Sequence, residues 1–224
     1  MVNQEVFHEL LAELESSSTQ LVAVSKIKPA SDIKALYDLG QRDFGENYVQ
    51  ELLEKVPLLP QDIRWHFIGH LQSNKVKYIA PFVYMIHGVD SFKLLQEINK
   101  QAEKNDRIIR VLLQVHIADE ETKFGLDENE VIELMEYYAA QREKMSHVQI
   151  CGLMGMASFS EDESQVRKEF QQLKAVFSIV KQSYFLGNND FKELSMGMSG
   201  DYALAVEEGS TMVRIGSMLF GRRK

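Results

Sequence analysis

The stretch "SMGMSGDYALAVEEGSTMVRIGS" (residues 195–217) has the layout of a strand, a turn, a helix, a second turn and a second strand. Two short apolar segments, 193–197 and 212–216, run into glycine and serine, and the segment 201–208 between them is a helix candidate. A helix that joins two neighbouring strands returns the chain to the same edge, so the strands run parallel. The stretch therefore predicts a β-α-β unit of an α/β fold.

The same alternation runs back to the start of the chain and predicts eight strands. We expect strands at 21–25, 43–46, 65–69, 82–88, 108–116, 148–156, 193–197 and 212–216. We expect helices between them at 31–39, 47–56, 73–79, 91–104, 128–142, 162–185 and 201–208. Ser31 with Asp32, Ser91 and Asp127 are the predicted N-terminal caps of the first, fourth and fifth of these helices.

Eight strands that alternate with helices, several of them apolar on both faces, predict one (β/α)8 TIM barrel domain over residues 1–224. An extra N-terminal helix is expected over 2–15, with Val6, Leu10, Leu11 and Leu14 on one side. Only "SMLFGRRK" follows the eighth strand, so the last helix should be absent or one turn long, and the N-terminal helix should cover that face. A doubly wound open sheet is the alternative, but no G-x-G-x-x-G turn follows the first strand.

Composition narrows the class of protein. The apolar fraction of 45% and the charged fraction of 26% are typical of a soluble globular domain. The net charge of −8 argues against a nucleic-acid binder, and no apolar run is long enough to predict a membrane span. The single cysteine, Cys151, excludes an internal disulfide framework, is expected in the core, and suits a reducing cytoplasm.

Two further patterns carry no predicted site. His66 and His70 are four residues apart, but "HFIGH" is predicted to be a strand that runs into a loop, so no metal site is expected. The acidic "DEET" (119–122) and the basic "GRRK" (221–224) are expected to be a solvated loop and a solvated terminus.

Small and polar residues gather where the last two predicted strands end. In α/β barrels this is the active face, and the loops after strands seven and eight commonly bind phosphate. Glycine lets backbone N–H groups approach a ligand closely, and a helix N-terminus favours an anion. We therefore expect a phosphate seat here, rather than two ordinary tight turns, built from Ser195, Gly197, Ser199, Gly200, Gly216 and Ser217.

The first strand, "LVAVS" (21–25), is followed directly by Lys26, although a core strand has no need of a lysine. Partial burial lowers the pKa of a lysine, and Arg214 nearby would act in the same direction, so a neutral amine could form a Schiff base with an aldehyde. A ligand with an aldehyde at one end and a phosphate at the other would bridge Lys26 and the phosphate seat, and pyridoxal 5′-phosphate (PLP) is that ligand. Lys28, beside Pro29, is the second candidate, and a solvated charge is the alternative interpretation of Lys26.

Longer motifs resemble a known family. "AVSK", "DFGENYVQE", "WHFIGHLQSNK", "GLMGMA" and "LSMGMSGDYALAVEEGSTMVRIGSMLFGRR" closely resemble the pyridoxal phosphate homeostasis proteins, also called the proline synthetase co-transcribed or alanine-racemase N-terminal-domain-like family. The resemblance covers essentially the whole chain. It implies a barrel like the N-terminal domain of alanine racemase, PLP linked to Lys26, and Arg214 against the pyridine nitrogen. The other predicted cofactor-binding residues are Asn47, His70, Ser195, Met196, Ser199, Gly216 and Ser217.

The same resemblance implies control of vitamin B6 supply. Arginine cannot accept the proton that a carboxylate would share with the ring nitrogen, so it weakens the electron sink on which PLP catalysis depends. The second domain of alanine racemase and its catalytic tyrosine have no counterpart in this sequence, and no catalytic residue is predicted.

We therefore expect a monomeric, cytoplasmic PLP homeostasis protein that holds the cofactor as a Schiff base on Lys26. Its expected partners are PLP and PLP-dependent apo-enzymes, with no nucleic acid or membrane among them. The alternatives are a PLP-dependent amino-acid racemase of narrow scope and a barrel that binds a different phosphorylated metabolite.

Overall fold

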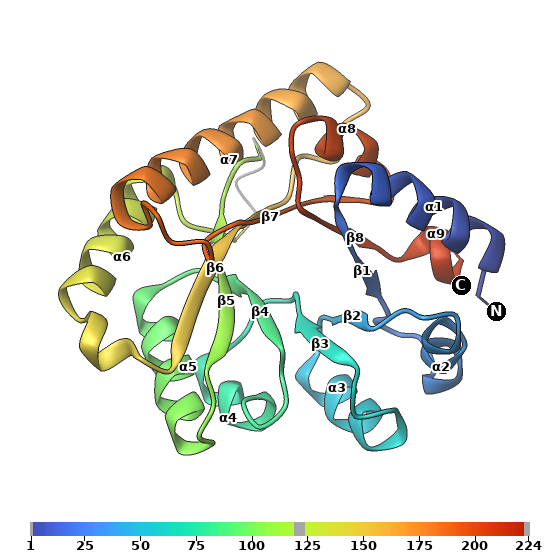
Figure 1. Ribbon diagram of the computed structural model, residues 1–224, viewed down its shortest axis with the longest axis horizontal. Coiled ribbons are helices and arrows are strands. Elements are labelled where there is room, and N and C mark those ends of the chain that lie inside the picture. Colours follow the sequence, from blue (N-terminus) through green and yellow to red (C-terminus); the bar gives the residue numbers. More distant parts are fainter. Residues whose placement is uncertain (1, 119–123, 222–224) are drawn as a thin grey trace.

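The computed structural model describes residues 2–118 and 124–221 (Figure 1). The expected acidic loop at 119–122 and residues 222–224 of the basic end lie outside these ranges. The described strands close into a barrel in chain order, each parallel to the next, and β8 pairs with β1. The predicted barrel is thereby confirmed, with β1 (Gln20–Val24), β2 (Asp43–Glu46), β3 (Arg64–Phe67), β4 (Met85–Val89), β5 (Ile109–Val115), β6 (Val148–Gly155), β7 (Glu193–Met198) and β8 (Met212–Ile215).

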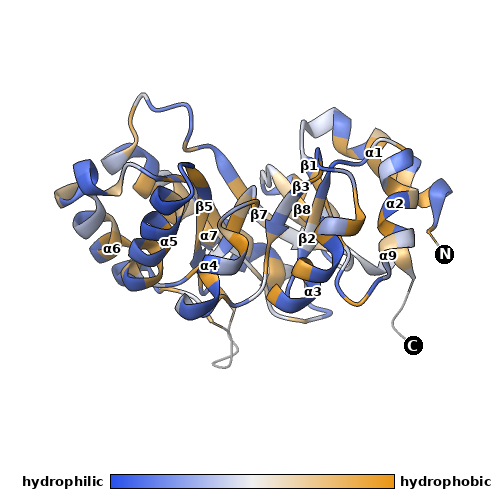
Figure 2. Cartoon of the chain, turned by 90° about the horizontal axis from the view of Figure 1, so that it is seen from below, coloured by the Kyte–Doolittle hydropathy of each residue, from blue (hydrophilic) through white to orange (hydrophobic). Residues whose placement is uncertain are grey.

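Helices surround the barrel (Figure 1). They are α1 (Gln4–Ser17), α2 (Ala30–Asp38), α3 (Val49–Lys55), α4 (Val76–Ile79), α5 (Phe92–Lys104), α6 (Glu128–Ala140), α7 (Glu163–Tyr184), α8 (Tyr202–Glu207) and α9 (Ser217–Phe220), with 3-10 turns η1 (Val56–Leu58), η2 (Ser73–Lys75) and η3 (Arg142–Met145). The outer helices carry both hydrophilic and hydrophobic residues (Figure 2), as expected for helices with one face on the barrel. Among the described helices, none is both long and apolar enough to span a membrane.

The first and last helices lie side by side (Figure 1), and the Asn3 N–H donates a 2.9 Å hydrogen bond to the Leu219 carbonyl. The last helix is one turn long, and α1 packs beside it, as the sequence predicts. The buried side of α1 consists of Phe7, Leu10 and Leu14, whereas Leu11 is 36% exposed. Leu11 therefore lies at the exposed edge of the predicted side, and Phe7, which the pattern did not include, is buried there instead.

Two of the three predicted helix caps are confirmed. The Ser91 side chain accepts from the Leu94 N–H, and Asp127 forms a full capping box with Glu130. The cap of α2 is a correction, because Pro29 is its N-cap and Ser31 lies inside the first turn with Asp32. Proline has a fixed φ that suits the start of a helix, so the chain begins turning earlier than the polar pair suggests.

Side-chain alternation along the strands produces two separate cores. One face of each strand packs outward against the helices in the large cluster that includes Phe44, Trp65 and Val213. The other face fills the barrel, where the apolar members are Val22, Met85, Leu112, Cys151, Met154 and Met212. Cys151 is 4% exposed, and burial raises the pKa of its thiol to about 12, so it is the small core residue that the sequence predicts.

Candidate functional site

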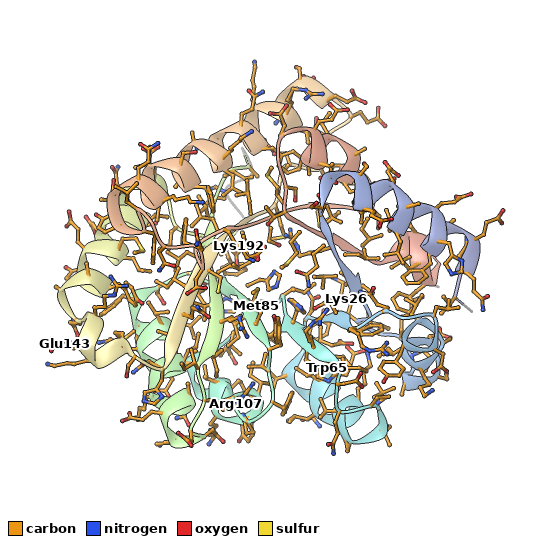
Figure 3. All side chains as sticks on the ribbon, viewed as in Figure 1. Lys26, Trp65, Met85, Arg107, Glu143 and Lys192 are labelled. Atoms are coloured by element: carbon orange, nitrogen blue, oxygen red, sulfur yellow. The ribbon has the colours of Figure 1, made fainter. Side chains whose placement is uncertain are left out.

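Lys26 lies in the turn directly after β1, on the rim of the barrel (Figure 3), and its side chain is partly buried. Val22 on the same strand packs inside the barrel, whereas Leu21 and Ala23 pack outward. β1 ends at Val24, and Lys26 follows two residues later in the turn, at the end of the barrel where the strands finish. The sequence-predicted lysine therefore stands at the mouth of the barrel.

A buried cluster on the outer side of β1 and β2 holds the turn that carries Lys26. The Lys55 ammonium donates to the Ser25 carbonyl at 2.8 Å, to Glu46 Oε1 at 2.7 Å and to Glu51 Oε1 at 2.6 Å. Ser25 Oγ donates to Glu46 Oε1 at 2.6 Å. Burial raises the pKa of Glu46, and the hydrogen bonds from Lys55 and Ser25 oppose that rise. No local sequence pattern points to this cluster, which links α3 to the lysine turn.

The backbone of the same turn is strained at Ile27, whose φ is +66°. A β-branched residue rarely adopts this left-handed conformation, which costs about 1–2 kcal/mol. The Ile27 N–H donates to Glu51 Oε1, and its side chain is 62% exposed. The conformation is therefore held by the contact with α3 and by the 3.0 Å hydrogen bond from the Lys28 N–H to the Ser25 carbonyl, and not by burial of the isoleucine.

Lys28, the second candidate, has a different environment. Its ammonium donates to the carbonyl oxygens of Phe220 and Gly221, at 2.8 and 3.3 Å. These contacts fasten the turn after β1 to the end of α9. Lys28 is therefore a structural cation, and Lys26 is the better candidate for a ligand.

Arg214 occupies the inward-facing position on β8, beside Val22 of β1 in the sheet register. It is 4% exposed, and its guanidinium donates to Ser195 Oγ at 2.7 Å and to the Gly155 carbonyl at 3.0 Å. Burial lowers the pKa of Arg214 to about 10, although the Asp201 carboxylate opposes the shift. Arg214 is thus a charged, desolvated donor inside the barrel, which is the position that the sequence analysis anticipated.

The two loops of the predicted phosphate seat touch one another. The Gly216 N–H donates to Ser199 Oγ at 3.3 Å, which joins the loop after β7 to the loop after β8. Ser217 is exposed at the start of α9. Gly197 has φ of +95°, and a Cβ there would lie 2.6 Å from the Ala205 Cβ, so glycine is required for α8 to pack against β7. The pairing of loops predicted from the sequence is present.

Two of the predicted cofactor-binding residues, Ser195 and Met196, have side chains in the interior of the fold. Ser195 is fully buried, and its hydroxyl contacts Arg214 and His87. Met196 is fully buried on the outward face of β7, in the core under the helices. Neither side chain reaches the loops at the mouth, so any direct phosphate contact there falls to Ser199, Gly216 and Ser217.

Asn47 and His70 line a common cleft of about 470 Å³ between α3 and α4. Asn47 Oδ1 is buried without a hydrogen-bond partner among the described residues. His70 is exposed, stacks on Phe124 with ring centroids 4.7 Å apart, and has Nδ1 3.4 Å from an oxygen of Asp90. The two predicted wall residues are therefore neighbours, but the cleft they share does not include Lys26 or Arg214.

The inside of the barrel holds a set of buried polar side chains that was not predicted from the sequence. His66 lies between Asp43 and His87, 2.9 Å from each, and His87 continues to Ser195. His66 was considered only as a possible metal ligand with His70, but His66 points into the barrel whereas His70 lies on the rim. Within 2–118 and 124–221, no group of three or more His, Cys, Asp or Glu side chains is arranged so that it could hold a metal ion.

Comparison with known proteins agrees with this geometry. The family model of the alanine racemase N-terminal domain matches residues 7–224. The pyridoxal phosphate homeostasis protein of Aquifex aeolicus is 41% identical over 206 residues, which is 92% of this chain and 87% of the relative. The chain belongs to the pyridoxal phosphate homeostasis protein family. The human relative of the same name is 42% identical over 221 residues, covering 94% of this chain and 79% of its own.

Solved structures with a similar barrel include one relative in two states, without and with PLP bound. PipY of Synechococcus elongatus, solved without PLP, has a TM-score of 0.84 and 38% identity over 95% of this chain and 99% of PipY. PipY with PLP bound has a TM-score of 0.82 and 37% identity. Alanine racemase of Bartonella henselae, 18% identical with a TM-score of 0.70 over 96% of this chain and 58% of the racemase, shows the likeness of fold alone.

Proposed function

We propose that this chain binds pyridoxal 5′-phosphate at the mouth of its barrel, covalently on Lys26, and holds the cofactor in reserve. The observation that carries the proposal is the position of Arg214, a fully desolvated guanidinium on β8, the strand that pairs with the lysine-bearing β1. When bound, PLP supplies an aldehyde carbon that combines reversibly with amines and a ring that withdraws electrons.

The residues present fit this group. A guanidinium with few water contacts favours an acceptor such as a ring nitrogen nearby, and its two intramolecular bonds go to neutral oxygens. The unpartnered Asn47 Oδ1 is a polar atom whose burial costs free energy until it finds a donor. Lys26 would hold the aldehyde carbon, Arg214 would face the ring nitrogen, and Ser199, Gly216 and Ser217 would bind the phosphate. Asn47 and His70 would approach from the α3 side.

The chemistry of Arg214 supports holding rather than catalysis. A guanidinium donates hydrogen bonds and does not take a proton from the ring nitrogen. With a pKa of about 10, Arg214 remains charged at neutral pH, which disfavours a second positive charge on the ring. The unprotonated ring is a weaker electron sink, so the site favours storage. The proposal includes a monomeric, cytoplasmic protein that passes the cofactor to PLP-dependent apo-enzymes.

The test is reduction of the PLP-treated protein with borohydride, followed by peptide mass mapping. We expect the mass of the reduced cofactor on Lys26 and on no other residue at one equivalent. Attachment to Lys28, or to no lysine, would overturn the assignment. A mixture of loaded protein and an apo-enzyme would test transfer, and light scattering would test the monomer.

A second measurement separates storage from catalysis. The loaded protein is incubated in deuterium oxide with single L-amino acids, and exchange of the α-proton is followed. Storage predicts no sustained exchange over a broad panel of amino acids. Sustained exchange with any one of them would support the alternative function, a racemase of narrow scope.

A further inference from the structure

A file of buried polar side chains crosses the interior of the barrel. Asp43 stands at the start of β2, His66 on β3, His87 on β4, Ser195 on β7 and Arg214 on β8. All five are at most 4% exposed, and Val22, Met85, Leu112, Cys151, Met154 and Met212 pack inside the barrel with them. Because an apolar filling would cost less than five buried polar groups, this file needs a physical reason.

The contacts along the file are continuous. His66 Nε2 lies 2.9 Å from Asp43 Oδ1, and His66 Nδ1 lies 2.9 Å from His87 Nε2. His87 Nδ1 lies 3.3 Å from Ser195 Oγ, which accepts from Arg214 Nη1 at 2.7 Å. The contact between His87 and Ser195 crosses the barrel from β4 to β7. The Asp43 end borders a cleft of about 620 Å³ beneath α1, which Arg64 also lines.

The two ends of the file fix the direction of every hydrogen bond in it. A guanidinium can only donate. Burial alone would raise the pKa of Asp43, but hydrogen bonds from Arg64 and His66 lower it well below its ordinary value, so Asp43 is ionised and can only accept. A neutral imidazole has one N–H and one acceptor nitrogen.

With both rings neutral, one pattern satisfies every member. Arg214 donates to Ser195, Ser195 donates to His87 Nδ1, His87 Nε2–H donates to His66 Nδ1, and His66 Nε2–H donates to Asp43. Burial, helped by the charge of Arg214, lowers the pKa of His87 well below its ordinary value, which keeps this ring neutral.

We propose that Asp43, His66 and His87 are positioning residues for Arg214, which they orient through Ser195 by a one-directional hydrogen-bond relay. The proposal rests on the proposed function to the extent that Arg214 is taken to face the cofactor ring. The relay holds one Nη of the guanidinium and the Gly155 carbonyl holds the other, so the plane of the guanidinium is fixed before the cofactor arrives. Preorganisation of this kind increases affinity by reducing the ordering that binding requires.

The first test uses the cofactor-free protein labelled with nitrogen-15 in histidine and arginine. At neutral pH we expect His66 and His87 in the Nε2-protonated form, with Hε2 signals protected from solvent exchange. In Asp43→Asn, these signals and the side-chain signals of Arg214 should shift, although Arg214 lies at the opposite end of the file. Nδ1-protonated rings in the wild type, or unchanged Arg214 signals in Asp43→Asn, would overturn the relay whether or not PLP binds.

The second test measures PLP affinity in single and double variants. Asp43→Asn, His87→Phe and Ser195→Ala should each raise the PLP dissociation constant by about three- to tenfold, since each breaks one link. The double variant Asp43→Asn with His87→Phe should lose no more than the worse single variant, because the two residues act through one path. Met154→Leu, which changes a barrel side chain outside the relay, is the matched control, with an effect under about twofold.

The outcomes are distinguishable. If the wild type fails to bind PLP, the proposed function fails and the nuclear magnetic resonance result alone decides the relay. If PLP binds and the two single effects add fully, the residues act independently and the positioning role is wrong. Asp43→Asn and Ser195→Ala change little volume, so they serve where His87→Phe fails to fold, as judged by thermal melting.

Discussion

The ammonium of Lys28 donates a 2.8 Å hydrogen bond to the carbonyl oxygen of Phe220, the last residue of α9. This contact joins the turn after β1 to the last helix and gives Lys28 a role separate from that of Lys26. We expect Lys28→Ala to lower the free energy of unfolding by about 1 kcal/mol and to leave PLP attached to Lys26. Denaturant unfolding checks the change in stability, and peptide mass mapping checks the site of PLP attachment. Loss of attachment in Lys28→Ala, with Lys26 intact, would contradict this division of roles.

A substitution at Ile27 is expected to raise the stability of the protein, because the backbone of Ile27 is strained at φ of +66°. Asparagine adopts the left-handed conformation more readily than a β-branched residue, and the isoleucine side chain loses little because it is 62% exposed. Ile27→Asn should therefore raise the free energy of unfolding by about 1 kcal/mol. Ile27→Val keeps the branched Cβ and should leave it nearly unchanged. Equal values for the two variants in a denaturant titration would show that no strain resides there.

Gly69 follows β3 at a place where two backbones come close together. A Cβ at this position would lie 2.3 Å from the Asn47 carbonyl oxygen, so Gly69→Ala must displace the loop that carries Asn47. We expect a loss of about 1–3 kcal/mol in the free energy of unfolding, together with weaker PLP binding. Gly200→Ala is the control, because no heavy atom lies within 4 Å of its added Cβ. If both alanine variants were equally stable, the close approach at Gly69 would not be real.

The structural features that the sequence could predict are those that depend on short local patterns of residues. Eight strands could be placed because each apolar run ends in small or polar residues, and Lys26 and Arg214 became candidates because they stand at or near such ends. The caps of α5 and α6 follow from single residues at the start of a helix. The α2 cap failed because Pro29 begins the helix without any side-chain hydrogen bond.

The buried polar contacts depend on closure of the barrel, which no local pattern encodes. His66 and His87 each occupy an inward position on a short strand, but only the closed barrel places His87 opposite Ser195 of β7. Lys55 looks like a surface residue at the end of a helix, and yet it reaches the Ser25 carbonyl beneath the lysine turn. The sequence did contain one sign of the buried histidine. Trp65 and Phe67 are apolar and face outward under the helices, so His66 between them on the same strand faces the barrel interior.

Lys55 is the only cation hydrogen-bonded to Glu46 among the described residues, and the two side chains are 8% and 0% exposed. Lys55→Met would leave a buried carboxyl group without its charged partner, which costs about 3–5 kcal/mol when the group stays ionised. Lys34→Met is the matched control, because the Lys34–Asp38 pair is about half exposed and should contribute less than about 1 kcal/mol. Denaturant midpoints of the two variants, measured side by side, check the difference. Similar losses in both would mean that the cluster under the lysine turn adds no stability.

The lowered pKa of Asp43 makes the stability of the protein depend on pH. Hydrogen bonds from Arg64 and His66 hold the folded-state pKa of Asp43 below the ordinary value of 3.8, against the opposing effect of burial. A group with a depressed pKa stabilises the fold above its unfolded-state pKa and loses that contribution as the pH falls. On acidification below about pH 4, the wild type should therefore lose up to about 1.4 kcal/mol per pH unit more than Asp43→Asn, which has no proton to bind. The raised pKa of Glu46 acts with the opposite sign, but it is common to both proteins and cancels in the comparison. Parallel curves of unfolding free energy against pH would show that Asp43 is not the ionised end of the relay.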